Sequence, residues 1–136
     1  TNRKDNYATY ANRFDHCNVT NMRLYLNSEF FPYTNLNLDF GNKKHALAYK
    51  LFTDFQRSFY NRDSVLTVSF NDYRLNYPIF VIDCSKQNER LKNTVNDIRL
   101  EVQTSVAFAA NTSCHVLIIH DKIKEYTPFS NIVRPL

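Results

Sequence analysis

The stretch that decides the fold covers residues 21–40, NMRLYLNSEFFPYTNLNLDF. Residues 22–26 alternate apolar side chains with polar or amphipathic ones, which is the period of a strand with one buried face. Residues 27–28 predict a turn, and Pro32 marks residues 30–33 as an edge or a corner because proline cannot donate to a central ladder. Apolar residues alternate again at 36–38 and predict a second short strand. The stretch therefore favours a β fold.

One segment of the chain has helical period instead. A helix is predicted over residues 43–60, and Asn42 can cap its first turn. We expect this helix to lay an apolar stripe on a sheet, because residues spaced four apart share one helix face. The stripe consists of Leu47, Leu51, Phe55 and Phe59.

Further strands are predicted where the period returns to two or the chain is apolar throughout. They cover residues 65–70, 78–82, 98–102, 114–120 and 123–126. We expect 78–82 and 114–120 to be buried on both faces, and 123–126 to pair with 114–120 across a turn. Residues 84–96 carry turn chemistry. Seven or eight strands with one inserted helix predict a two-sheet sandwich, either a jelly roll or an immunoglobulin-like arrangement.

The length of 136 residues corresponds to one domain, predicted over residues 14–136, preceded by an arm or connector at residues 1–13. The chain opens on Thr1, so we expect it to be a processed product or a piece of something larger. No apolar run is long enough for a membrane helix, and the front of the chain has no signal-peptide pattern. Three widely spaced cysteines predict a reducing compartment rather than a disulfide framework.

The single glycine, Gly41, excludes two classes of binding site. Dinucleotide fingerprints and phosphate-cradling loops need several glycines so that backbone can approach the phosphate closely. The formal charge of +4 is modest and its basic residues are scattered along the chain. Nucleic-acid contact therefore has no clear patch in the sequence, and a solvated basic surface is the favoured interpretation.

Two constellations could carry chemistry. The residues of a nucleophile triad occur at Asp83, Cys84, Ser85, His120 and Asp121, but the chain lacks the small-residue turn that builds an oxyanion hole. A metal site could draw on a second set, which has no short-range ligand spacing. That set is His16, Cys17, Cys84, Cys114, His115 and His120. We predict that the protein is not an enzyme and that it has no catalytic residue, metal site or cofactor.

Aromatic residues are the more informative feature. Nine Tyr and eleven Phe exceed what one small core easily hides. Those next to turns predict a protein–protein interface, because aromatic rings give a large contact area at low entropy cost. The alternative is that they plug the two ends of the sandwich. The candidate interface residues are Phe30, Phe31, Tyr33, Tyr126, Pro128 and Phe129.

Several stretches of the chain carry a resemblance to a known family. They are YLNSEFFPY at 25–33, LNLDF at 36–40, the predicted helix at 49–60, FVIDCSKQNE at 80–89, ANTS at 110–113, LIIHD at 117–121 and EYTP at 125–128. In order and spacing they resemble the C-terminal part of the double jelly-roll, major-capsid-like proteins of Maverick/Polinton elements and adintoviruses. The resemblance covers about residues 14–136.

The resemblance implies an all-β jelly-roll β-sandwich of about eight antiparallel strands with one inserted helix at about 43–60. It implies a structural capsid-type protein, located in a virion capsid and within the host cell. Its partners would be copies of itself or a companion jelly-roll lobe in a trimeric capsomer. Only one jelly roll fits in this length, so the other lobe would be missing, cleaved or supplied by another chain. The alternative is a domesticated jelly-roll binding module with a host protein or ligand as partner.

Overall fold

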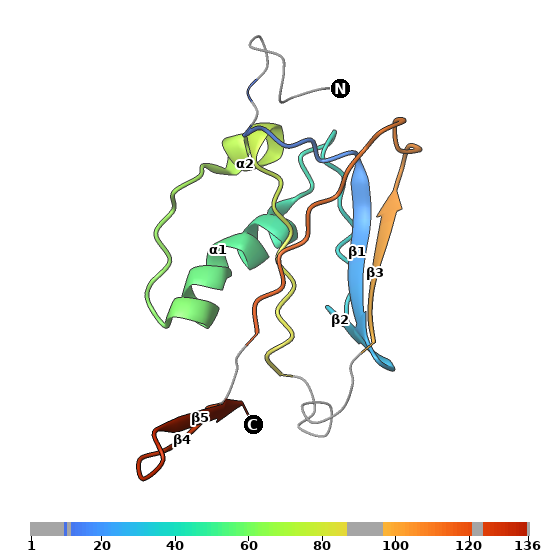
Figure 1. Ribbon diagram of the computed structural model, residues 1–136. Helices are drawn as coiled ribbons and strands as arrows, with labels where there is room; N and C mark the ends of the chain where they lie inside the picture. Colours follow the sequence, from blue (N-terminus) through green and yellow to red (C-terminus); the bar gives the residue numbers. More distant parts are fainter. Residues whose placement is uncertain (1–9, 11, 87–96, 121–123, 136) are drawn as a thin grey trace.

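The computed structural model describes residue 10 and residues 12–86, 97–120 and 124–135 (Figure 1). It contains a three-stranded sheet, in the order β2-β1-β3, and a two-stranded sheet, β4-β5. Figure 1 shows α1 and α2 on one side of the three-stranded sheet and the β4-β5 hairpin at the bottom of the view. The elements are β1 Val19–Leu26, β2 Glu29–Phe31, α1 Ala46–Tyr60, α2 Phe70–Asn76, β3 Ile98–Thr104, β4 Lys124–Thr127 and β5 Ile132–Pro135.

Strand β1 is the centre of the larger sheet and pairs antiparallel with both neighbours. Leu24 lies opposite Phe31 on β2 and opposite Leu100 on β3, so these three apolar side chains share a face. Asn27 takes the left-handed conformation with φ 55° in the turn between β1 and β2, which asparagine tolerates well. The predicted strands at 22–26 and 98–102, the turn, and the edge position of residues 30–31 are all confirmed.

The core lies between this sheet and the helices. It consists of Val19, Met22, Leu36, Leu38, Phe40, Ala48 and Tyr73. The prediction of a strand at 36–38 was wrong, although its two leucines are buried as expected. The Leu38 N–H donates to the Thr20 carbonyl at 2.8 Å, and the Leu36 N–H donates to the Asn21 side chain at 3.1 Å. These two bonds hold the segment against β1 without a ladder.

Helix α1 begins later than predicted and turns a different face to the core. Residues 39–44 form a closed turn in which the Asn42 side chain bonds to the Asp39 carboxylate, so Asn42 is not the helix cap. The predicted stripe on residues 47, 51, 55 and 59 was wrong in part, because Leu47 and Phe59 are exposed. The buried face is centred instead on Ala48, beside which Tyr49, Leu51 and Phe52 pack on the core.

The prediction of a strand at 65–70 was wrong, because residues 65–69 belong to no helix or strand and Phe70 begins helix α2. Ser69 is the N-cap, since its hydroxyl accepts the Asp72 N–H at 3.1 Å and donates to the Asp72 carboxylate at 2.7 Å. This side-chain cap satisfies an N–H that has no partner inside the helix. The described residues therefore contain two helices where one was predicted.

Two further predicted strands, at 78–82 and 114–120, are not present in the structure. Residues 78–82 and 114–120 belong to no strand, and residues 114–120 are exposed rather than buried. Strand β4 pairs with β5 and not with residues 114–120. Five strands are present in the described ranges, so the predicted count of about eight is not confirmed. Most of the predicted arm at 1–13 and of the turn region at 84–96 lies outside the described residues. Neither of the helices in the described part of the chain could span a membrane.

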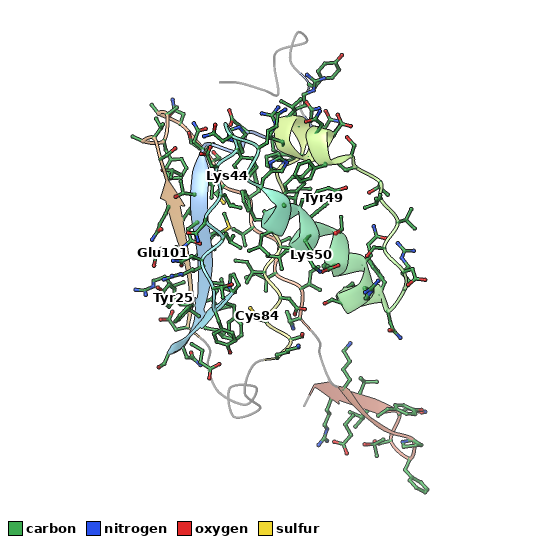
Figure 2. All side chains as sticks on the ribbon, turned by 180° about the vertical axis from the view of Figure 1, so that it is seen from behind. Tyr25, Lys44, Tyr49, Lys50, Cys84 and Glu101 are labelled. Carbon is green, nitrogen blue, oxygen red and sulfur yellow. The ribbon has the colours of Figure 1, made fainter. Side chains whose placement is uncertain are left out.

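An aromatic stack fills the space between the helices and the sheet. The His45 ring is fully buried and stacks on Phe70 at 4.0 Å and on Phe40 at 5.5 Å between centroids. Its Nε2–H donates to the Phe70 carbonyl at 3.2 Å, which fixes the tautomer because a carbonyl can only accept. Tyr73 closes the stack, and its hydroxyl donates to the Ile79 carbonyl at 3.0 Å. Figure 2 shows Tyr49 beside the start of α1, near α2.

Substitution of Tyr73 tests this packing. We expect Tyr73→Phe to lower the free energy of unfolding by about 1 kcal/mol, through loss of one hydrogen bond. We expect Tyr73→Ala to lower it by about 3–5 kcal/mol, because a cavity forms in the core. Urea unfolding measures both, and Tyr33→Phe is the exposed control that should change little. Equal midpoints for Tyr73→Ala and the unaltered chain would contradict the buried position of this ring.

The buried histidine predicts a pH dependence of stability. Burial is the largest cause that lowers the pKa of His45, and the Arg74 cation lowers it further, while the bond to the Phe70 carbonyl opposes them. Because the folded pKa lies below the unfolded value, the unfolded state binds the proton more tightly. The stabilisation is therefore complete above the unfolded pKa and is lost as the pH falls below it.

We expect the free energy of unfolding to fall between about pH 7.5 and about pH 5.5, by at most about 1.4 kcal/mol per pH unit for one proton. Urea midpoints across this range measure the effect. The variant His45→Phe should flatten the profile, whereas His115→Asn, at an exposed position, should keep it. The same slope in His45→Phe as in the unaltered chain would assign the dependence to another group.

Candidate interaction surface

The six candidate interface residues lie in two places. Phe30 and Tyr33 lie at the β2 edge of the larger sheet, where Tyr33 is 63% exposed. Tyr126, Pro128 and Phe129 lie in the β4-β5 hairpin and its turn, and all three are exposed. Phe31 is buried at 3% exposure and packs inside the chain. Five of the six are therefore accessible at least in part, in two separate clusters.

The first cluster belongs to a larger surface on the outer face of the sheet. Side chains that lie opposite one another in antiparallel strands point to the same side. Tyr25 lies opposite both Phe30 and Arg99, and Arg23 lies opposite Glu101, so these residues share the face that points away from the core. We call this surface the aromatic–arginine face; it comprises Arg23, Tyr25, Phe30, Tyr33, Arg99 and Glu101.

Rings and cations alternate across the aromatic–arginine face. The Tyr25 and Phe30 centroids are 5.9 Å apart, and Tyr33 lies 6.2 Å from Phe30. The Arg99 guanidinium lies 4.3 Å from the Tyr25 centroid, and the Arg23 guanidinium lies 5.1 Å from that of Phe30. Stacking of this kind holds long arginine side chains flat on the sheet, which lowers the entropy lost when a partner binds.

The aromatic–arginine face also carries one carboxylate, that of Glu101. Glu101 accepts a hydrogen bond from the Tyr25 hydroxyl at 3.0 Å and another from the Gln103 amide at 2.8 Å. The bond from Tyr25 is the largest cause that holds the pKa of Glu101 below its usual value, followed by the bond from Gln103. Figure 2 shows Tyr25 and Glu101 on the side of the sheet away from the helices. The face therefore offers aromatic rings, two cations and one ionised acid.

The two arginines of this face were not predicted from the sequence. Arg23 and Arg99 are far apart in the chain and come together only because β1 and β3 pair in one register. The available signal was local: each is a polar residue that alternates with apolar ones in a predicted strand. That alternation predicts that each arginine side chain points away from the core, but it does not predict which aromatic ring lies beside each arginine.

Asp83 and Cys84, two residues of the candidate nucleophile triad, have pKa values shifted by burial and by their neighbours. Burial opposes ionisation of Asp83, but hydrogen bonds from Ser85 and from the Ser58 hydroxyl hold the pKa of Asp83 below its usual value. Burial raises the pKa of the Cys84 thiol, and the Asp83 charge raises it further. A thiol of this kind is a weaker nucleophile at neutral pH than an ordinary cysteine.

The metal-ligand candidates are not gathered into one place. Among the residues that the structure describes, no group of three or more His, Cys, Asp or Glu side chains could hold a metal ion. His16 stacks on Phe40 at 4.5 Å, and its Nδ1 accepts the Asn18 N–H at 3.0 Å. Cys114 is exposed and Cys84 is half-buried. The expectation that the protein has no enzymatic role stays a prediction.

Comparison with known proteins gives one match. The family model described as a double jelly roll-like domain matches residues 1–124. No curated protein and no solved structure matches this chain. The match covers most of the chain and supports the predicted double jelly-roll family, without distinguishing a Maverick/Polinton member from others.

The bond between Tyr25 and Glu101 generates a test of the aromatic–arginine face. We expect Tyr25→Phe to raise the pKa of Glu101 towards its usual value, because the ring remains and only the O–H donor is lost. An NMR titration of the glutamate side chain measures the shift. Tyr33→Phe is the matched control and should leave that pKa unchanged. An unchanged pKa in Tyr25→Phe would show that the bond does not form in solution.

Proposed function

The chain belongs to the double jelly roll-like domain family, and we propose that it is a structural capsid-type protein that assembles with other jelly-roll lobes into a shell. The observation that carries the proposal is the family match over residues 1–124. Proteins of this kind act by contact between subunits, so their functional residues are those of interfaces. The exposed rings of the two candidate clusters are residues of that type.

The exposed aromatic residues support this proposal in detail. Phe129 is 104% exposed and Tyr126 is 56% exposed, although rings of this size are normally at least partly covered in a monomer. Tyr33 adds a third exposed ring at the edge of the aromatic–arginine face. Large exposed rings at turns are typical anchors of protein interfaces, since each removes much apolar area from water on binding.

The finer features of the proposal come from the sequence resemblance. We assign the chain to the Maverick/Polinton branch of double jelly-roll capsid proteins, on the stretches at 25–33, 80–89 and 117–121. Its partners are then copies of itself or a companion jelly-roll lobe, arranged in a trimeric capsomer. The place of action is a virion capsid within the host cell. No enzymatic step is part of this role.

Solution mass and electron microscopy test the proposal. We expect the chain to form a discrete trimer or a larger particle, visible by analytical ultracentrifugation and then by negative-stain microscopy. Cys84→Ala and His120→Ala should assemble as the unaltered chain does, because no chemistry at these side chains is needed. A strict monomer at high concentration would count against the shell and favour a binding module with a different partner.

A further inference from the structure

Residues 113–119, SCHVLII, form an extended segment without a strand partner. Val116, Leu117, Ile118 and Ile119 are 63%, 84%, 60% and 47% exposed. Among the described residues, no hydrogen bond reaches the backbone of 113–119. Backbone N–H and C=O groups are obligatory hydrogen-bonding groups, and an unpaired apolar strand is a template for another chain. Figure 1 shows this part of the chain as an extended trace that leads down towards the hairpin.

The β4-β5 hairpin is a second part of the described chain whose apolar side chains are left exposed. Its two strands pair with each other, with Tyr126 opposite Val133 and Thr127 opposite Ile132. Among the helices and strands that the structure describes, the hairpin contacts no other element. Val133 and Ile132 are 56% and 43% exposed. Because an isolated two-stranded hairpin is only marginally stable in water, this one needs a third strand or a surface to cover it.

The described residues carry exposed apolar area in the C-terminal part of the chain. A continuous part of this area lies on residues 116–119, and another part lies on the hairpin. Contiguous exposed apolar patches of this kind mark interaction surfaces.

The two parts have complementary chemistry. Residues 113–119 offer a free backbone edge with apolar side chains, and the hairpin offers a free edge with Tyr126 and Val133 on one face. The hairpin carries the charges of Lys124, Glu125 and Arg134, whereas residues 113–119 contain no Asp, Glu, Lys or Arg. No like-charge pair of acidic groups opposes their approach. Strand β4 already uses one edge on β5, so its other edge is the one available for pairing.

We propose that residues 113–119 accept the β4-β5 hairpin of a second copy of this chain as an added antiparallel strand pair. The proposal rests on the assembly role proposed above and names the surface that carries it. Main-chain hydrogen bonds supply the affinity, and the apolar side chains on alternate positions supply the register. Each copy has one acceptor segment and one donor hairpin, so a head-to-tail exchange in which each copy donates to the next closes into a ring, such as the trimer proposed above.

Cross-linking between two differently labelled chains tests the exchange directly. One chain keeps Cys114 as its only cysteine, through Cys17→Ser and Cys84→Ser. The other chain lacks all three native cysteines and carries Thr127→Cys. After mild oxidation of the mixture, we expect a disulfide between position 114 of one chain and position 127 of the other, identified by peptide mass spectrometry. Arg57→Cys, on the exposed face of α1, is the matched control and should cross-link far less.

Charge substitutions give a second measurement that does not depend on the register. We expect Leu117→Asp and Val133→Asp each to weaken self-association about tenfold or more in analytical ultracentrifugation. Leu66→Asp, at a residue 69% exposed outside both parts, should have no effect. An equal mixture of Leu117→Asp and Val133→Asp chains should recover part of the association, because one intact acceptor and one intact donor remain in each mixed pair.

The outcomes separate this proposal from the assembly role itself. If the unaltered chain assembles and both charge variants assemble equally well, the exchange is wrong and the shell role remains. If the disulfide forms mainly between two Cys114 residues, the partner of residues 113–119 is the same segment of another copy and not the hairpin. Cross-linking within one chain carrying both Cys114 and Thr127→Cys, seen as a monomer on a non-reducing gel, would overturn exchange between copies. A strictly monomeric chain would overturn both proposals.

Discussion

The aromatic stack of Phe40, His45 and Tyr73 is the contact on which the rest of the described body depends. Phe40 ends the segment that runs along β1, His45 precedes the first turn of α1, and Tyr73 belongs to α2. The stack therefore joins one edge of the sheet to both helices at a single place. Protein interiors are close-packed, so three rings that exclude water together hold these elements in one arrangement. The outward direction of the aromatic–arginine face follows from this, because the opposite face of β1 is committed to the core.

The composition of the core explains why apolar side chains in the C-terminal part of the chain are exposed. The buried cluster and the side chains packed on it come from residues 19–82 and from β3. Residues 113–119 and the β4-β5 hairpin add nothing to it, and their apolar side chains remain in water. Surface of that kind is stabilised when a neighbouring subunit covers it, because a partner that binds only the folded state stabilises that state. The division into a packed body and C-terminal segments with exposed apolar side chains accordingly fits the assembly role proposed above.

Local pattern predicted some elements correctly and failed at others for identifiable reasons. The alternation in β1 and β3 and the asparagine turn after Leu26 were sufficient, because each signal acts within a few residues. Residues 36–38 show the same alternation, yet their leucines are buried without a ladder, since alternation reports side-chain environment and not backbone pairing. The β-branched residues at 65–68 had favoured a strand but form none, and a side-chain cap between Ser69 and Asp72 starts α2 at Phe70, the last residue of that predicted strand. The candidate rings at Phe30 and Phe129 were identified from their position beside turns, whereas Arg23 and Arg99 were not.

The amino-acid sequence by itself determined which segments carry apolar alternation, where the asparagine turns lie, and which family the stretches of the chain resemble. Only the tertiary structure decided which strands pair, which face of α1 is buried, and which arginine lies on which ring. The physical reason is the range of the interactions. Period and turn chemistry act between residues a few positions apart, but Tyr25 reaches Glu101 across 76 positions and His45 reaches Phe70 across 25. Such contacts exist only after the chain has chosen one register and one packing among the several that its local pattern allows.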